Sequence, residues 1–121
     1  MEWDIRNAQP IYPHLIQQVT LAILSGTFPC GGRLPPVREM AAEAGVNPNT
    51  MQRALAELER TGLVYTQRTA GRFVTEDAAV IDSAKQELAH QQVGAFLRRM
   101  ERMGYDREQA AQLVRSWKEE A

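Results

Sequence analysis

The stretch from Gly45 to Gly62 constrains the fold more than any other part of the chain, because it combines a helix start, an apolar stripe, a polar face and a stop. Asn47 followed by Pro48 predicts the start: an asparagine side chain can cap free backbone N–H groups, and proline suits the first helical position. Gly62 predicts the end, since glycine readily adopts the left-handed conformation that closes helices. We therefore expect a helix that begins near Pro48 and closes at Gly62.

This predicted helix has one apolar face and one polar face. Apolar residues recur at the i, i+3, i+4 and i+7 spacing that places side chains on one stripe of a helix. They are Met51, Ala54, Leu55 and Leu58. Asn49, Gln52 and Arg53 fall outside that stripe, within the first two turns. The helix should therefore bury one side against a core and expose polar side chains near its start.

A shorter helix is predicted just before it. The segment from Val37 to Ala44 has apolar residues at helical spacing, and Gly45 supplies the turn that follows. Two helices joined by a short turn that contains glycine, the second with an exposed polar N-terminus, form a helix-turn-helix. Residues 11–25 predict another helix ahead of them, and the glycines and prolines of residues 27–36 predict a loop.

A β-hairpin is expected after Gly62. Residues 63–67 are predicted as a strand, residues 68–71 as a turn and residues 72–75 as a returning strand. Helices followed by such a hairpin make a winged helix-turn-helix. Near the N-terminus, residues 2–6 alternate apolar and charged side chains, which indicates a short extended segment.

The rest of the chain predicts a helical hairpin. A long helix should start near Ala78 and stop at Gly104, with a kink between His90 and Gly94 where the apolar register drifts. Asp106, with a glutamine three residues later, has the pattern of a capping box and predicts a last helix. The tail should therefore consist of two amphipathic helices joined by a short turn.

The apolar stripes of these tail helices cannot be buried against each other alone, so they need either the winged helix or a second chain. We favour a second chain, because symmetric dimers are the commonest oligomers and a helix-turn-helix gains affinity by doubling its half-site. The predicted interface residues are Leu88, Phe96, Met100, Met103, Leu113, Val114 and Trp117. The expected fold is mainly α with a small β-hairpin, with a winged helix-turn-helix DNA-binding domain over residues 1–75 and a two-helix dimerisation tail over residues 76–121.

Composition excludes several classes of protein. A chain of 121 residues suits one ordinary domain or a small domain with an appendage, and its net charge of −1 gives no hint of nucleic acid. No apolar run approaches the roughly 20 residues of a membrane span, and no signal peptide pattern opens the chain, so we expect a cytoplasmic protein. Cys30, His14 and His90 have no partners at metal-ligand spacing. Without a nucleophile-base pair or a phosphate-binding glycine loop, no enzyme, metal or cofactor is predicted.

Several linked stretches resemble the GntR family of bacterial transcription regulators. They are Pro10-Ile11-Tyr12, residues 31–41 (GGRLPPVREMA), residues 46–50 (VNPNT), residues 54–59 (ALAELE) and Gly62-Leu63-Val64. The short tail, with its turn at Gly104-Tyr105, resembles the YtrA-like subfamily. The resemblance implies a winged helix that binds a palindromic operator as a dimer, usually as a repressor, and a tail that serves dimerisation.

The same resemblance implies which residues lie on DNA. They are Arg38, then Asn47, Asn49, Thr50 and Gln52 at the start of the second helix of the motif, and Gly71 in the hairpin. The hydroxyl of Thr50 suits a phosphate. The hairpin reads Thr69-Ala70-Gly71 where the family usually has two glycines flanking one residue, and this departure stiffens its tip.

Residue chemistry adds to that set. Asn49 and Gln52 suit bidentate pairing with adenine, whereas Arg53 suits guanine or a phosphate. Arg68 and Arg72 flank the hairpin turn and suit the DNA backbone or a narrow minor groove, whose negative potential attracts arginine. These residues extend the predicted DNA surface from the helix to the hairpin.

Two functions remain open on the sequence alone: a dimeric DNA-binding regulator, or a winged helix used for protein interaction, which the near-neutral charge permits. Arg38 could pair with Glu39 or Glu43, and the polar face could simply be solvated. We favour DNA binding, with Glu57 and Glu59 repelled by phosphate so that their end of the helix tilts away from the duplex. The sequence predicts neither the operator nor an effector, although the methionine-rich tail could admit a small apolar molecule.

Overall fold

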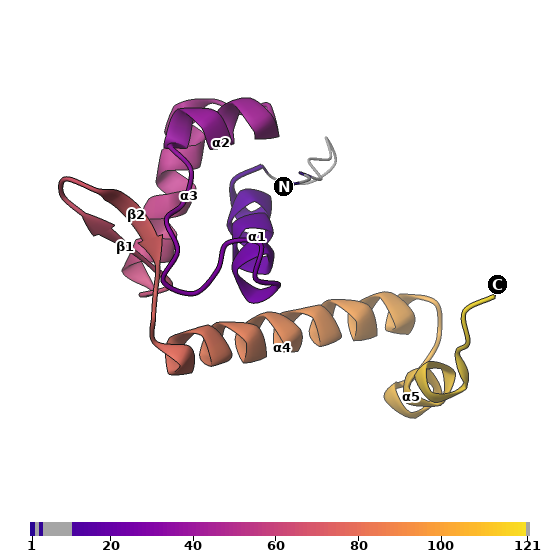
Figure 1. Cartoon of the computed structure of the whole chain (residues 1–121). Coiled ribbons are helices and arrows are strands. Elements are labelled where there is room, and N and C mark those ends of the chain that lie inside the picture. The colour runs from indigo at the N-terminus through magenta and orange to yellow at the C-terminus, as the bar shows by residue number, and fades with distance from the viewer. Residues whose placement is uncertain (2, 4–10, 121) are drawn as a thin grey trace. The chain divides into compact units, whose positions relative to one another are not determined.

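The computed structural model describes residues 1, 3 and 11–120, and it is mainly helical with one small hairpin, as predicted (Figure 1). In chain order the elements are α1 (Ile11–Leu24), α2 (Val37–Ala44), α3 (Pro48–Arg60), β1 (Val64–Gln67), β2 (Gly71–Val74), α4 (Ala78–Arg102) and α5 (Arg107–Ser116). The chain divides into two compact units, Met1–Lys85 and Gln86–Ala121, with the boundary inside α4.

The first unit is built around one apolar core. The stripe predicted on α3 is buried, with Met51 and Leu55 both 0% exposed. Side chains from α1, α2 and both strands complete this core, among them Leu15, Val19, Ile23, Met40, Ala41, Val64 and Val74. Helices α1 and α2 both pack against α3 and fix one of its sides (Figure 1). On its other side Asn49, Gln52 and Arg53 are exposed.

The turn between α2 and α3 depends on Gly45. The N–H of Gly45 donates to the carbonyl of Ala42 (3.3 Å) and the N–H of Val46 donates to the carbonyl of Ala41 (3.0 Å). These are the paired bonds of a Schellman motif, which needs a left-handed residue, and Gly45 has a φ of +70°. An equivalent pair of hydrogen bonds, from the N–H groups of Gly62 and Leu63, closes α3. The predicted helix-turn-helix is therefore confirmed.

The predicted hairpin is also confirmed. β1 and β2 run antiparallel with Val64 opposite Val74 at the core end and Gln67 opposite Gly71 at the tip. The N–H of Ala70 donates to the carbonyl of Gln67 (3.1 Å) and closes the turn. The hairpin is anchored by its buried valines and presents its turn to solvent.

The free edge of β2 pairs with a segment that the sequence assigned to a loop. Arg33 forms a bridge with Phe73. On either side of it, the N–H of Leu34 donates to the carbonyl of Arg72 (2.8 Å) and the N–H of Val74 donates to the carbonyl of Gly32 (2.9 Å). This pairing fixes the hairpin to the segment that leads into α2.

The extended segment predicted over residues 2–6 falls almost wholly outside the described residues. Trp3 is described: it packs against the core, and its Nε1 donates to Oε2 of Glu43 at 3.4 Å.

Helix α4 is continuous from Ala78 to Arg102, so the interruption expected between His90 and Gly94 is absent. A glycine costs a helix about 1 kcal/mol but keeps its backbone N–H, so a single glycine need not break the hydrogen-bond ladder. The first turns of α4 belong to the first unit, because Val80, Ile81 and Ala84 pack against its core. Across the part of the chain that the structure describes, no helix is long and apolar enough to cross a membrane.

The second unit contains the end of α4 and all of α5. The N–H of Gly104 donates to the carbonyl of Glu101 (2.9 Å) and that of Tyr105 to the carbonyl of Met100 (3.0 Å), another Schellman ending. The capping box predicted for α5 is confirmed. Oδ1 of Asp106 accepts from the N–H of Gln109 (2.8 Å), and Oε1 of Gln109 accepts from the N–H of Asp106 (2.9 Å).

Candidate nucleic-acid interface

The start of α3 carries most of the predicted DNA-contacting residues. Asn47 has extended backbone, and its Oδ1 accepts from the N–H of Asn49 at 2.8 Å, which caps the helix as predicted. Asn47, Asn49, Gln52 and Arg53 are exposed and Thr50 is half-buried. This capping hydrogen bond fixes where the first turn of α3 begins. It uses the side-chain oxygen of Asn47 and not the two N–H donors of its amide nitrogen.

Arg53 is held by an aromatic ring from another helix. Its guanidinium lies over the ring of Tyr12 of α1, with Cζ 4.6 Å from the ring centroid. A cation above an aromatic face is attracted by the ring quadrupole, while the N–H donors at the edge of the guanidinium stay free to bond elsewhere. Tyr12 therefore restrains Arg53 without using its hydrogen-bonding capacity.

A polar network joins α3 to the hairpin. The Nε of Arg72 donates to Oε1 of Glu59 at 2.8 Å, and its Nη1 donates to Oε1 of Gln52 at 3.3 Å. The hydroxyl of Thr66 on β1 also donates to Oε1 of Glu59. The side chain of Arg72 is only 17% exposed. The hairpin is thus tied to α3 at two levels, through Glu59 and through Gln52.

The electrostatics of this network favour an ionised Glu59. The hydrogen bond from Thr66 lowers the pKa of Glu59, and Arg72 lowers it further, while partial burial acts in the opposite direction. Glu59 and Arg72 therefore cancel each other's charge.

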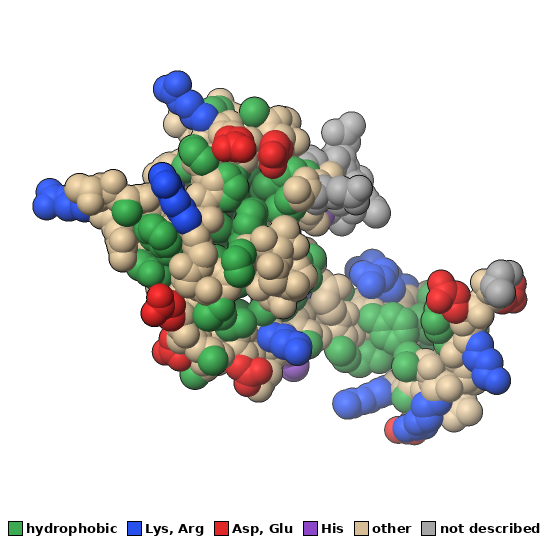
Figure 2. Space-filling model, in the orientation of Figure 1, with side chains coloured by type: hydrophobic (Ala, Val, Ile, Leu, Met, Phe, Trp, Pro, Cys, Tyr) green, Lys and Arg blue, Asp and Glu red, His purple; other side chains and the backbone are tan. Residues whose placement is uncertain are grey.

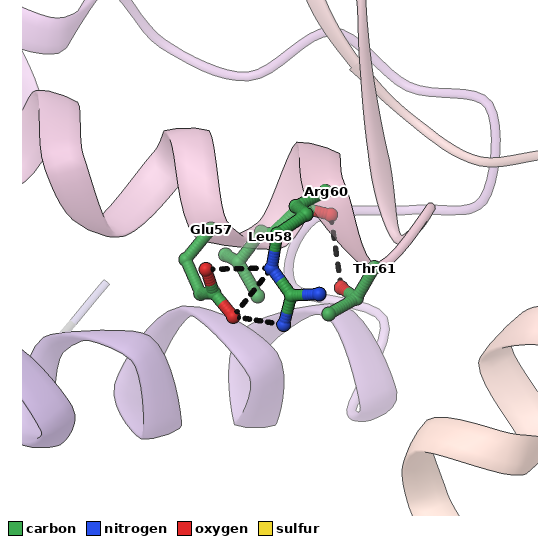
Figure 3. Close-up of polar contacts among 4 residues, drawn as sticks. All are labelled: Glu57, Leu58, Arg60 and Thr61. Atoms are coloured by element: carbon green, nitrogen blue, oxygen red, sulfur yellow. Dashed lines mark hydrogen bonds and ion pairs between the residues drawn. The ribbon is translucent and has the colours of Figure 1, made fainter.

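The last turn of α3 neutralises its other carboxylate in the same way (Figure 3). Arg60 folds back along the helix, and its Nε donates to both carboxylate oxygens of Glu57, at 3.1 and 3.0 Å. This hydrogen bond lowers the pKa of Glu57. The hydroxyl of Thr61 donates to the carbonyl of Leu58 at 3.1 Å and closes the helix end. The two acidic residues expected to repel phosphate are thus both paired with arginine.

The hairpin turn presents Arg68, which is exposed. Gly71 has a φ of +108°, and a Cβ built there would lie 3.2 Å from Nε of Arg33. The glycine is therefore needed for its backbone angle and for the close approach of a guanidinium. Arg33, which was not among the predicted site residues, therefore lies beside the base of the turn.

Arg38 lies exposed on α2, and among the described residues it has no ion pair with Glu39 or Glu43. Of the predicted DNA-contacting residues, Gln52 and Arg72 are hydrogen-bonded to each other. Arg38, Thr50 and Arg68, all of which the structure describes, form no hydrogen bond or ion pair with one another.

Within the described part of the chain, several arginines of this unit have no carboxylate partner, although the chain as a whole is near neutral. With Glu57 and Glu59 paired, the described residues provide no carboxylate partner for Arg33, Arg38, Arg53 or Arg68. Figure 2 shows basic side chains projecting at the hairpin tip and beside α2. Unpaired guanidinium groups are what a surface needs to replace counterions on a phosphate backbone.

Sequence reasoning missed the positioning residues Tyr12, Arg33 and Glu59. Tyr12 belongs to an element distant in sequence from Arg53, and Arg33 sits in a segment rich in glycine and proline that carries no strand signal. Glu59 is visible in the sequence as an acidic residue on the polar face of the helix. Its partner Arg72 lies on the hairpin, so the helical pattern does not predict the ion pair. Each contact is tertiary, so no local pattern reports it.

The residues predicted to form the dimer interface lie in the second unit. Leu88, Phe96 and Met100 are half-buried along α4. Met103, Leu113, Val114 and Trp117 are exposed, and Trp117 follows the last residue of α5. The apolar stripe of the tail is therefore largely uncovered within one chain.

Residues 11–74, which span all of α1, α2, α3 and the hairpin, match the family described as bacterial regulatory proteins, gntR family. The chain belongs to the GntR family. This confirms the resemblance drawn from the motifs.

Two curated HTH-type regulators are similar to this chain, one of them over nearly its whole length. The HTH-type transcriptional regulator YhcF of Bacillus subtilis is 33% identical over 119 residues, which cover 98% of this chain and 98% of YhcF. The HTH-type transcriptional repressor YtrA of the same species is 43% identical over 75 residues, covering 62% of this chain and 58% of YtrA. The predicted likeness to YtrA is thereby confirmed.

A solved structure supports the arrangement of elements. A GntR family transcriptional regulator from Listeria monocytogenes aligns with a TM-score of 0.83 at 34% identity, covering 94% of this chain and 100% of that one. As a member of the GntR family the chain is a DNA-binding transcription regulator and not an enzyme. The matched residues 11–74 are those of the winged helix-turn-helix described above.

Proposed function

We propose that this GntR-family chain is a dimeric repressor that binds a palindromic operator through the first two turns of α3 and through the hairpin. Asn49, Gln52 and Arg53 would contact base edges, while Thr50, Arg38 and Arg68 would contact the phosphate backbone. A repressor of this kind would work in the cytoplasm, where bacterial operator DNA lies.

One observation carries the proposal: the exposed polar residues at the start of α3 are restrained by contacts from two other elements. Arg53 lies over Tyr12 at 4.6 Å, and Gln52 accepts from Arg72 at 3.3 Å. A solvated helix face has no need of such restraints, because exposed long side chains lose rotamer entropy when they are held. Restraint before binding lowers the entropy that a contact must otherwise overcome.

Charge supports the same conclusion. Glu57 and Glu59 would oppose a phosphate backbone if they were free, but Arg60 and Arg72 pair with them. The remaining arginines of the first unit are then available to DNA. The name of the relative YtrA, a transcriptional repressor, supports repression as the direction of regulation.

The direct test is fluorescence anisotropy with an inverted repeat from the promoter of the chain's own operon. We expect Gln52→Ala and Arg53→Ala to weaken binding to that repeat by about tenfold or more, and the wild-type affinity to fall steeply with salt. Arg115→Ala, a basic residue of α5, is the matched control and should change binding little. Equal binding to random duplex by the wild-type chain would refute the proposal.

Dimerisation is proposed from the second unit. Among its described residues Ala110 is buried, whereas Val93, Leu113, Val114 and Trp117 are between 43% and 71% exposed. Figure 2 shows hydrophobic side chains gathered on the visible face of this unit. Exposed apolar surface on this scale favours association. A second copy of the chain is the occupant that an inverted repeat requires, since operator symmetry mirrors protein symmetry.

A further inference from the structure

We propose that Arg72 orients the side-chain amide of Gln52, so that Gln52 reads guanine and not adenine. The inference rests on the proposed binding of operator DNA by α3 and names the base that this position selects. In this proposal Arg72 positions Gln52 and does not itself contact the DNA backbone.

The geometry fixes Arg72 first. Its Nε donates to Glu59 at 2.8 Å, and Glu59 is itself held by the hydroxyl of Thr66. The Arg72 side chain is 17% exposed, so most of it is packed against α3 and the hairpin. From this anchored position Nη1 reaches Oε1 of Gln52 at 3.3 Å. The guanidinium therefore comes to Gln52 from a fixed direction.

The chemistry then fixes Gln52. A guanidinium has five N–H donors and no acceptor, so the amide atom that faces it must be the oxygen. Oε1 of Gln52 is thus turned toward Arg72 and one of its lone pairs is occupied. The Nε2 group, with its two donors, is the end of the amide left to face solvent.

A glutamine presented in this way matches one purine better than the other. Bidentate reading of adenine needs the amide oxygen to accept from N6 while the nitrogen donates to N7. Guanine instead offers two acceptors, N7 and O6, in the major groove. Since Gln52 presents donors, and Arg72 beside it presents only donors, the pair complements guanine. Adenine would have to place its N6 donor on the one lone pair of Oε1 that Arg72 leaves open, beside a guanidinium that itself offers only donors.

Arg68 is the residue to compare with Arg72, because it could bind phosphate without positioning another side chain. It is exposed on the hairpin turn and has no carboxylate partner among the described residues, whereas the charge of Arg72 is cancelled by Glu59. Removal of Arg68 should therefore lower affinity for every sequence alike. Removal of Arg72 should change which sequence is preferred.

The test is a selection of binding sites from a random duplex library with the full chain, followed by anisotropy on the selected sites. Gln52→Ala identifies the base pair that Gln52 reads, as the position whose preference disappears. We expect guanine at that position for the wild type. With Arg72→Met, which keeps an unbranched side chain but cannot donate, we expect the ratio of guanine to adenine affinity to fall by about tenfold. Arg68→Met should weaken binding and leave the ratio unchanged.

A second variant keeps the test independent of how well Arg72→Met folds. Gln52→Glu changes only an exposed side chain and replaces the amide donors with acceptors, so its guanine preference should be lost. Adenine at the Gln52 position in the wild type, or a guanine preference that survives either Arg72→Met or Gln52→Glu, would overturn the inference. If the wild type enriches no sequence at all, the proposed function fails and this inference falls with it. An enriched sequence that Gln52→Ala does not alter overturns the inference alone.

Discussion

The two compact units of this chain resemble each other in their helix ends and differ in what their apolar residues touch. Both close a helix with a Schellman turn and start one with a side-chain cap, at Asn47 in the first unit and Asp106 in the second. The first unit buries its stripe, with Leu55 0% exposed. In the second, Val114 on α5 is 59% exposed.

This difference indicates that local signals form helices in both units, whereas only the first unit has the surfaces needed to pack them. The first unit has α1, α2 and the hairpin to cover α3, but the second has two helical segments and one turn. Amphipathic helices gain most of their stability from packing of the apolar face. The first unit should therefore be stable by itself, and the second should gain its stability from association.

The largest effect should come from the core of the first unit. Leu55→Ala should lower its free energy of unfolding by about 2–5 kcal/mol, because a fully buried leucine leaves a cavity when truncated. Leu113→Ala, which is 43% exposed, is the matched truncation in the second unit and should cost the first unit less than about 0.5 kcal/mol. Urea denaturation followed by circular dichroism measures both. Equal losses would contradict the division into a packed and an unpacked unit.

The next effect concerns association. Leu113→Asp combined with Val114→Asp should raise the dissociation constant of the dimer by about a hundredfold or more, because unpaired carboxylates would be buried in the proposed interface. Sedimentation equilibrium measures the change, and operator binding should weaken with it. Leu21→Asp is the control, since Leu21 of α1 is equally exposed at 44% but lies in the first unit. A dimer that tolerates both aspartates would rule out this face as the interface.

The helices of the first unit, its hairpin and the capping box of α5 were predictable from the sequence, because each is specified by residues close together in the chain. Asn47-Pro48 starts α3 and Gly62 closes it, and both ends are where the pattern indicated. The error over residues 90–94 has the same origin. A drift in apolar spacing was interpreted as a kink, but the spacing reports which face packs and not whether the backbone hydrogen bonds continue.

The restraints on the candidate site were not predictable, because they join residues distant in sequence. The bridge between Arg33 and Phe73 and the contact between Arg53 and Tyr12 both arise only when the unit folds. Arg72 is the clearest example. Its position beside the hairpin turn suggested a DNA contact, yet its neighbours are Glu59 and Gln52 on α3.

A smaller effect compares the two caps. Asn47→Ala should lower the free energy of unfolding of the first unit by about 1 kcal/mol, the usual value for a lost N-cap. Asp106→Ala removes a similar cap from α5, but it should leave the first unit unchanged and speed hydrogen exchange of the α5 amides. Asn49→Ala is the control, since its backbone N–H and not its side chain takes part in the Asn47 cap. Loss of first-unit stability in the Asp106 variant would mean that the two units unfold together.

The smallest effect is a pH dependence confined to the network between α3 and the hairpin. The pKa of Glu59 lies below its ordinary value of 4.5, chiefly because of the hydrogen bond from Thr66. A carboxylate with a lowered pKa stabilises the folded state fully above about pH 4.5, and that contribution is lost as pH falls through the lowered pKa. Thr66→Val should therefore raise the pKa of Glu59 toward its ordinary value. It should lower the free energy of unfolding at pH 7 by about 0.5 kcal/mol. Below about pH 4 the difference in free energy of unfolding between the variant and the wild type should become smaller. NMR titration of the Glu59 carboxyl and urea denaturation at both pH values test this.

Thr61→Val is the control. It removes a comparable hydroxyl, one that donates to the carbonyl of Leu58 and to no carboxylate, so its effect on stability should be independent of pH. A pKa of Glu59 that stays low in the Thr66 variant would assign the shift to Arg72, and the ion pair would then be the main tie between the hairpin and α3.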